Sequence, residues 1–158
     1  MSYRILRPDG LPEPRGFSHG LLGPAGGRVL FVAGQTDAAP GGGVRGSDLA
    51  EQFEGALAAV LDVVAEAGGV PSHVGRLTIY VTDLEAYRAS RERIGRAYRD
   101  LMGRHYPAMA LVEVSGLVDE GALVEIEATA VLPPPGAGEA PSGGGDAPDD
   151  DTPSDPTP

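Results

Sequence analysis

Residues 48–82 read DLAEQFEGALAAVLDVVAEAGGVPSHVGRLTIYVT and pass from helical to strand periodicity within one stretch. Asp48 followed by Glu51 resembles a capping box, and Gly68-Gly69 provides the stop signal of a helix. Between them the apolar residues recur at helical spacing: Leu49, Phe53, Ala56, Leu57, Val60 and Val64. From residue 76 to 82 apolar and polar side chains alternate instead. The stretch therefore predicts a helix followed by a strand.

Similar patterns flank this stretch on both sides. Downstream, the spacing predicts a second helix over residues 83–101 with an arginine-rich solvated face, and strands over 108–115 and 122–132. Upstream, residues 17–22 and 28–34 read as two strands joined by a glycine-rich loop, so we expect them to form a hairpin. Tyr3 to Leu6 adds a short edge strand. This order predicts an α+β fold, a mixed six-stranded sheet with two helices packed on one face.

The face of the sheet that the helices leave free needs a cover of its own. In the last strand Glu125, Glu127 and Thr129 share one face, which we assign to the side away from the helices. We expect Met109, Leu111 and Tyr80 on that same face. A surface that combines large apolar side chains with carboxylates suggests a subunit interface that contains a cleft.

The last 26 residues, 133–158, differ from the rest in composition. They hold 8 of the 15 prolines, 5 of the 24 glycines and 6 acidic residues, and no aliphatic or aromatic side chain larger than alanine. Such a segment cannot bury enough apolar surface to offset the entropy lost on ordering. We therefore expect one folded domain over residues 1–132 and a disordered Pro/Gly/Asp-rich acidic tail over residues 133–158.

Charge and composition disfavour several classes of function. The chain has 12 basic and 23 acidic residues, and without the tail's 6 acidic residues the folded part still has 12 basic against 17 acidic. We therefore expect no nucleic-acid partner and no membrane partner. The sequence contains no lysine and no cysteine, which excludes Schiff-base and thiolate chemistry. With no signal-peptide core and no long apolar run, the expected location is the cytoplasm.

Two catalytic patterns are weak on inspection. Gly16-Phe17-Ser18-His19-Gly20 matches the G-x-S-x-G motif of serine hydrolases, but no helix follows it as that motif requires. His19, His73 and His105 lie far apart with no paired spacing, which disfavours a metal site. Glu125 and Glu127 should place two carboxylates about 7 Å apart on one strand face. Such a pair of carboxylates can act as general acid and general base in catalysis, although the spacing alone favours a polar interface or a solvated face.

Several short motifs occur in a fixed order over residues 16–131. They are GFSHG at 16–20, LFVAGQ at 30–35, EQ at 51–52, VTDL at 81–84, YPAM at 106–109, VEV at 112–114 and VEIEATA at 124–130. Together they resemble the Rid (YjgF-like) family of reactive-intermediate deaminases. The resemblance implies a chorismate-mutase-like fold and a homotrimer with small-molecule clefts between subunits. It also implies hydrolysis of imines or enamines to a carbonyl compound and ammonia, without metal or cofactor.

The resemblance also implies roles for single residues. Glu125 matches the family's water-activating glutamate. Met109 stands where the family has an arginine that grips the substrate carboxylate, Phe17 stands for a tyrosine, and Ala33 stands for a serine. Each replacement removes a polar contact, so the cleft should be more apolar and should not favour 2-iminoacids.

Two functions fit these residues. The first is a divergent hydrolase of a small imine, enamine or related amide in which Glu125 positions the water. The second is a non-catalytic trimer that binds a small apolar metabolite or a partner protein in the altered clefts. Arg104 and His105 are candidates to replace the missing clamp, although a different chain position rarely reproduces bidentate geometry. Turnover with and without Glu125→Gln separates the two functions.

Overall fold

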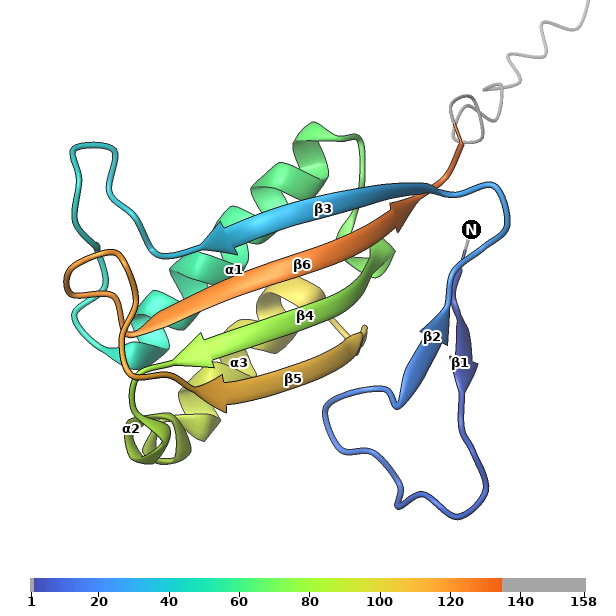
Figure 1. The fold of residues 1–158 in the computed structure, drawn as a ribbon, viewed down its shortest axis with the longest axis horizontal. Coiled ribbons are helices and arrows are strands. Elements are labelled where there is room, and N and C mark those ends of the chain that lie inside the picture. Colours follow the sequence, from blue (N-terminus) through green and yellow to red (C-terminus); the bar gives the residue numbers. More distant parts are fainter. Residues whose placement is uncertain (1, 135–158) are drawn as a thin grey trace, which may run out of the picture.

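The computed structural model describes residues 2–134 (Figure 1). The elements in chain order are β1 (Arg4–Leu6), β2 (Gly20–Leu22), β3 (Arg28–Gln35), α1 (Leu49–Glu66), the short 3₁₀ helix η1 (Pro71–His73), β4 (Val74–Val81), α2 (Leu84–Ala89), α3 (Arg91–Met102), β5 (Ala108–Glu113) and β6 (Val124–Leu132). None of the helices within this part of the chain has the length and apolarity needed to cross a membrane. The predicted tail lies outside the described residues, apart from its first two.

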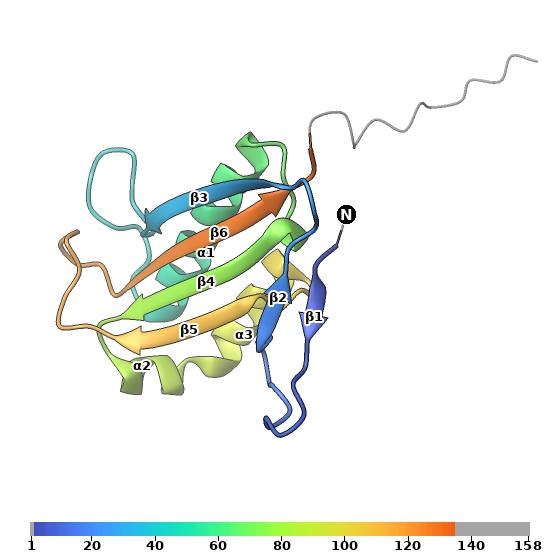
Figure 2. The same cartoon turned by 45° about the vertical axis from the view of Figure 1, so that its right-hand side comes forward.

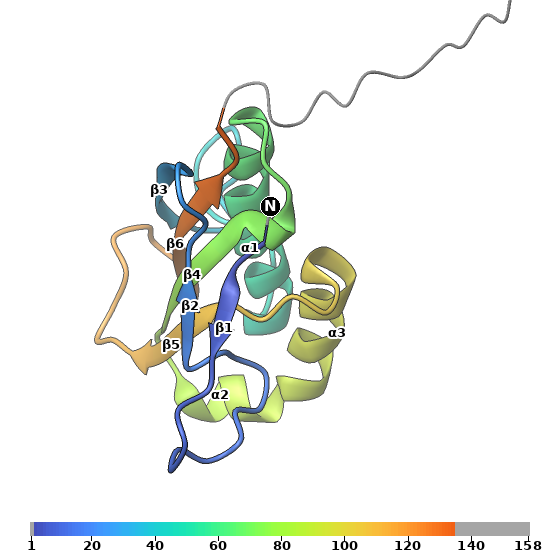
Figure 3. The same cartoon turned by 90° about the vertical axis from the view of Figure 1, so that its right-hand side faces the viewer.

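Four strands form a mixed sheet in the order β3-β6-β4-β5. β6 runs antiparallel to both of its neighbours, whereas β4 and β5 are parallel and are joined by a crossover through α2 and α3. The main helices α1 and α3 both lie on one side of this sheet, and the other side carries no helix (Figure 3). The α+β class and the two main helices on one sheet face are thus confirmed.

The helix α1 begins and ends where its sequence signals lie. The Oδ1 atom of Asp48 accepts a hydrogen bond from the backbone N–H of Glu51 at 3.0 Å, which satisfies one free donor of the first turn. Gly68 has a φ of 77° just after the last turn, a left-handed conformation that glycine adopts without strain. The second predicted helix is divided at Ser90, which ends α2 and precedes α3.

The hydrophobic core lies between the sheet and the helices. The inward positions of β6 alternate with partly exposed ones along its whole length, as the sequence predicts for a strand with one covered face. The side chains with the least exposure come from α1, β4 and β6: Leu57, Val60, Val74, Val81, Val124 and Ile126.

The predicted hairpin between residues 17–22 and 28–34 is wrong. β2 pairs with β1 in a separate two-stranded ribbon, and β3 pairs with β6. Figure 2 shows this ribbon next to the start of β5, away from β3. The hydroxyl of Tyr3 fixes it there, donating to the carbonyl of His73 at 2.7 Å and accepting from the N–H of Val131 at 3.0 Å. These contacts hold the ribbon at the end of the sheet, so the loop after Leu22 does not form a hairpin turn.

The predicted orientation of β5 is also wrong. In the parallel pair Leu77 lies beside Met109 and Ile79 beside Leu111. Paired residues point to the same face, and Leu77 and Ile79 are buried in the core beneath the helices. Met109 and Leu111 pack against that core as well. They therefore face the helices, and of the three residues predicted for the helix-free face only Tyr80 is found there.

Candidate functional site

The helix-free face carries the two glutamates of β6. Glu125 lies opposite Tyr80 and Glu127 opposite Thr78 in the register of β6 with β4. Both glutamates are half-buried, whereas their neighbours Val124 and Ile126 point into the core. The alternation of β6 thus presents the two carboxylates side by side on one face, as the sequence predicts.

The side chain of Glu125 lies against Gly34 of β3. A Cβ atom at position 34 would overlap the Glu125 carboxylate, so any side chain there would require that carboxylate to move. The register of β3 with β6 shifts between Val32 and Gln35, which places one extra residue on the β3 side. Such bulges occur often beside active sites, where they redirect the local chain. The bulge at the end of β3 therefore places Ala33 and Gly34 next to Glu125.

Tyr80 and Glu127 form a second polar pair on this face. The hydroxyl of Tyr80 donates to Oε1 of Glu127 at 3.3 Å. Desolvation raises the pKa of the Tyr80 hydroxyl, and the negative charge and hydrogen bond of Glu127 raise it further. Tyr80 therefore stays protonated at neutral pH and acts as a donor. The hydroxyl of Thr78, which lies opposite Glu127 in the register, is buried and has no partner among the described residues.

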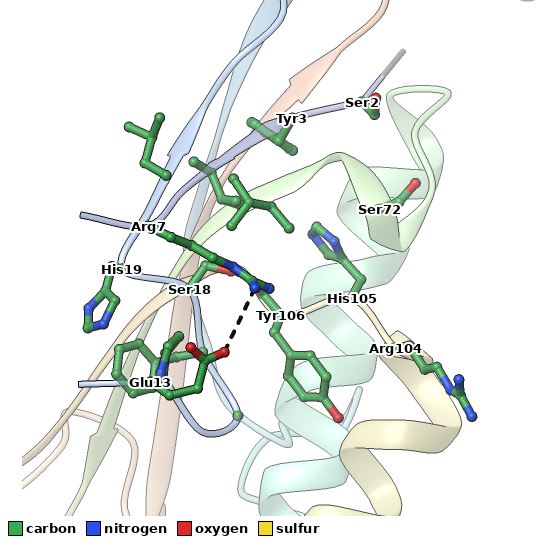
Figure 4. A pocket seen from close by; sticks show the side chains of 16 residues that line it. Ser2, Tyr3, Arg7, Glu13, Ser18, His19, Ser72, Arg104, His105 and Tyr106 are labelled. Atoms are coloured by element: carbon green, nitrogen blue, oxygen red, sulfur yellow. Dashed lines mark hydrogen bonds and ion pairs between the residues drawn. The ribbon is translucent and has the colours of Figure 1, made fainter. Parts of the chain in front are cut away.

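Phe17 lies elsewhere, in a cavity of about 470 Å³ between the β1–β2 ribbon and residues 104–106 (Figure 4). Arg104 and His105 line the same cavity as Phe17. Arg7 and Glu13 also line it and form an ion pair with their charged atoms 3.8 Å apart (Figure 4). Neither Arg104 nor His105 lines the cavity that contains Met109, so the structure gives no support to either residue as its replacement.

The G-x-S-x-G motif makes no Ser–His pair. Ser18 is buried, and its hydroxyl donates to the carbonyl of Tyr106 at 2.6 Å. The Nε2 atom of His19 is 2.7 Å from the carbonyl of Pro12. Both side chains therefore tie the N-terminal loop to its surroundings. Within residues 2–134 no group of three His, Asp or Glu side chains is placed to hold a metal ion.

Met109 lines a second cavity, of about 270 Å³, on the helix side of β5. Its walls come from α1, α3 and the strands, and its rim carries three arginines, Arg15, Arg91 and Arg99. Arg91 and Arg99 are exposed, as predicted for the arginine-rich side of the second helix, but they also line this cavity. Sequence spacing does not reveal this group, because Arg15 comes from a distant loop.

Gln52 is a further residue whose role the sequence does not disclose. Its buried amide donates to the carbonyls of Gly46 and Gly121, both at 3.1 Å, and its Oε1 accepts from the N–H of Leu123 at 2.7 Å. These bonds join two loops to α1 immediately before β6 begins. Gln52 thereby holds the chain two residues ahead of Glu125.

The four sequence-predicted residues therefore occupy three places in one chain. Glu125 and Ala33 lie together on the helix-free face, Met109 lies on the helix side of β5, and Phe17 lies beneath the ribbon. The sheet separates Glu125 from Met109. A single copy of the chain does not bring these two side chains into one cleft.

Known proteins of the same architecture exist. Residues 14–132 match a family described as Endoribonuclease L-PSP. A RutC family protein of Pyrococcus abyssi is 31% identical over 133 residues, which are 82% of this chain and 98% of that protein. The structure of YyfB from Yersinia pestis, a Rid family protein of unknown function, is 32% identical with a TM-score of 0.71, covering 84% of this chain and all of that one. The structure of E. coli TdcF with bound serine is 26% identical with a TM-score of 0.57, covering 81% and 98%.

Fold and matches together define an α+β protein of the YjgF type. The family match spans three quarters of the chain, including every strand of the four-stranded sheet and both of its main helices. The chain belongs to the Endoribonuclease L-PSP family, which includes the YjgF and Rid proteins.

Proposed function

We propose that this protein hydrolyses a small imine or enamine to a carbonyl compound and ammonia, with Glu125 activating the water. The observation that carries the proposal is the placement of the Glu125 carboxylate against Gly34, beside the bulge of β3. Because Gly34 has no side chain, the half-buried Glu125 carboxylate lies directly against the backbone of β3 while staying partly exposed to water and small molecules. The resemblance to the Rid deaminases, in which Glu125 matches the water-activating glutamate, supports the same chemistry.

The reaction needs proton transfers that one carboxylate can perform. Glu125 removes a proton from water as the oxygen adds to the carbon of a protonated C=N bond. Protonated Glu125 then returns this proton to the nitrogen of the carbinolamine. As the C–N bond breaks and the C=O bond forms, Glu125 takes up the hydroxyl proton and ammonia leaves. Glu125 loses that proton to the departing ammonia or to water before the next turnover. A positioned general base of this kind contributes about 10²–10⁴-fold to a rate.

A second copy of the chain completes the proposed site. Met109 is on β5, at one edge of the four-stranded sheet, and Glu125 is next to β3, at the other edge. Because the two residues also lie on opposite faces, the next copy has to bring its β5 edge onto the helix-free face beside β3, and head-to-tail contacts of this kind form a ring where the rotation closes. The homotrimer with clefts between subunits, implied by the family resemblance, meets this requirement.

We propose a small organic molecule as the substrate, and we do not propose cleavage of RNA despite the family's description. The chain carries a formal net charge of −11, which opposes binding to a polyanion. The serine bound to TdcF shows that a relative with this fold accepts a small molecule of the amino-acid type. Here Met109 offers a thioether where the resemblance implies a carboxylate clamp.

The main test compares Glu125→Gln with Glu54→Gln, a matched change at an exposed residue of α1. Ammonia release is followed with a panel of enzymatically generated imines. We expect a loss of about a hundredfold or more for Glu125→Gln and no change for Glu54→Gln. If no imine is turned over by the unmodified protein, or if Glu125→Gln leaves the rate unchanged, the hydrolase proposal is wrong and the non-catalytic binder takes its place.

The second test concerns the substrate's carboxylate. We expect poor hydrolysis of 2-iminopropanoate, because a methionine at position 109 makes no charge-assisted hydrogen bond, a contact worth about 1.5–3 kcal/mol. Met109→Arg should restore part of the rate, and Met109→Leu, which adds no charge, should not. Rapid hydrolysis of 2-iminopropanoate by the unmodified protein would contradict the argument from Met109.

A further inference from the structure

The cavity beside Met109 has a charge pattern opposite to that of the protein. Its rim holds Arg15, Arg91 and Arg99, and among the described residues that line it there is no aspartate or glutamate. In a chain with 23 acidic and 12 basic residues, a cavity whose only charged side chains are three arginines is unexpected by composition. Local positive potential in a concave site attracts anions.

The other arginines of α2 and α3 have carboxylate partners. Arg88 pairs with Glu85, Arg96 pairs with Glu92, and Arg93 pairs with Asp48. Arg91 and Arg99 on the same helix form no ion pair within residues 2–134, and neither does Arg15 from the N-terminal loop. The guanidinium groups at the cavity are therefore left with free donors, and those donors belong to two separate segments of the chain.

Gly95 makes the space between two of these arginines. It lies one turn after Arg91 and one turn before Arg99 on α3, and it lines the cavity. A Cβ atom at this position would lie 3.3 Å from Nη1 of Arg99. Glycine inside a helix lowers helix stability relative to alanine, so its presence here points to a need for room.

Behind the arginine rim the cavity is apolar and aromatic. Ile94 and Met109 form part of the wall, with the rings of Tyr98 and Tyr106 stacked at a centroid distance of 5.5 Å. Tyr87 also lines it, and burial raises the pKa of the Tyr87 hydroxyl while the nearby charge of Arg91 opposes that effect. Such a wall suits a flat or branched apolar group, and arginines at its rim suit a carboxylate.

We propose that this cavity binds a small organic carboxylate with an apolar or aromatic body, the carboxylate held by Arg91, Arg99 and Arg15 and the body lying on Met109 and the tyrosines. The clamp that position 109 lacks is thereby supplied from α3 and the N-terminal loop. The apolar body fills the space between the arginines and β5, which explains a methionine at position 109.

The substrate class follows if the proposed function also holds, and this step rests on it. A substrate carboxylate bound by the arginines of α3 lies farther from Glu125 than one bound by an arginine at position 109 would. The C=N bond of the substrate must therefore be separated from its carboxylate by an apolar spacer. The preferred substrate is then an imine or enamine whose carboxylate is distant from the reacting carbon. A 2-iminoacid, with the two groups adjacent, fits poorly.

Calorimetric titration of the full chain with phenylacetate and with phenylacetamide tests the binding site directly. The two probes share a body and differ in charge, so we expect phenylacetate to bind about tenfold tighter at low ionic strength and to weaken as salt is added. The double variant Arg91→Gln with Arg99→Gln should remove this preference. Arg96→Gln, on the same helix outside the cavity, should retain it. Equal binding of the two probes, an unaffected double variant, or an equal loss in Arg96→Gln would overturn the proposal.

Gly95→Ala supplies a second, independent variant. An added methyl group should raise the melting temperature, because alanine favours the helix, and should weaken phenylacetate binding by filling the space beside Arg99. Loss of binding through misfolding would lower the melting temperature instead. Unchanged phenylacetate binding in a stabilised Gly95→Ala protein would contradict the cavity as the site.

These measurements separate the two proposals. Within one chain Glu125 does not line this cavity, so imine turnover and phenylacetate binding report on different residues. If the anion fails to bind while imines are hydrolysed through Glu125, only the inference about the arginine cavity fails. If the anion binds through Arg91 and Arg99 while no imine is hydrolysed, the hydrolase proposal fails and the binding site stands.

Discussion

The described residues of a single chain cover one face of the four-stranded sheet and leave the other face open. On the helix-covered face Leu57, Val124 and Ile126 have no exposed surface. On the helix-free face Phe31 is 80% exposed and Val29 57% exposed. The first face is closed by the chain's own helices. The second combines exposed apolar side chains with the carboxylates of β6, and nothing in residues 2–134 covers it.

This difference bears on function because the proposed site spans both faces. Glu125 belongs to the uncovered face and Met109 to the covered one. The covered face supplies a rigid support, since every second residue of β6 is fixed in the core. The uncovered face supplies the carboxylate and the surface through which another copy can approach. Stability should therefore depend on the first face and assembly on the second.

Leu57→Ala should have the largest effect on stability. Leu57 lies on the sheet-facing side of α1 and has no exposed surface, so its truncation should cost about 2–5 kcal/mol of unfolding free energy. Urea denaturation at one fixed protein concentration measures it, with Phe31→Ala as the comparison on the opposite face. A loss for Phe31→Ala as large as that for Leu57→Ala would show that the uncovered face is part of the stable core.

Phe31→Asp should have its main effect on assembly. A charge in the middle of the exposed apolar surface opposes burial against another copy, so we expect the proposed trimer to dissociate to monomers. Val118→Asp, at a fully exposed loop position, should leave assembly unchanged. Light scattering at micromolar concentration distinguishes these outcomes. A monodisperse monomer in the unmodified protein would remove the basis of the proposed interface.

The elements with local signals were predictable from sequence. Asp48, Gly68 and the helical spacing between them determine α1 from neighbouring residues alone. The faces of β6 were predictable because only one alternation, that of Val124 and Ile126, is apolar while the other carries carboxylates. In α1 the helical spacing is incompatible with a strand, and in β6 the carboxylates are incompatible with the core-facing side.

Other features depend on contacts between distant segments. β5 has apolar residues in both alternations, Met109 and Leu111 against Ala110 and Val112, so its orientation follows only from its register with β4. The pairing of β2 depends on Tyr3, whose hydroxyl reaches both η1 and β6. The arginine cavity likewise brings together a loop, a helix and a strand edge. These three contacts join residues far apart in the sequence, so the spacing of residues along the chain does not predict them.

Asp48→Asn should have a smaller, pH-dependent effect on the covered side. The hydrogen bond from Arg93, and after it that from the N–H of Glu51, lowers the pKa of Asp48 below its ordinary 3.8. A lowered folded-state pKa contributes stability above the unfolded-state pKa, and that contribution is lost as the pH falls through the folded-state value. Asparagine retains the cap but not the charge. At neutral pH the melting temperature of Asp48→Asn should be lower than that of the unmodified protein. This difference should disappear as the pH falls below 3.8. An equal difference at both pH values would show that the Asp48 charge does not contribute to stability.

Deletion of residues 135–158 should have the smallest effect, and it tests whether the chain covers its own open face. This segment lies outside the described residues, which makes it a candidate within this sequence to shield Phe31. It contains no aliphatic or aromatic side chain larger than alanine, and its net charge is negative like that of the glutamates on that face. Burial of Phe31 against it would gain little and would add repulsion. The cut retains Pro133, whose carbonyl accepts a hydrogen bond from Arg28. We therefore expect an unchanged melting temperature and unchanged assembly in scanning calorimetry and light scattering. A lower melting temperature would show that the tail packs on the domain, and the open face would then need no second copy.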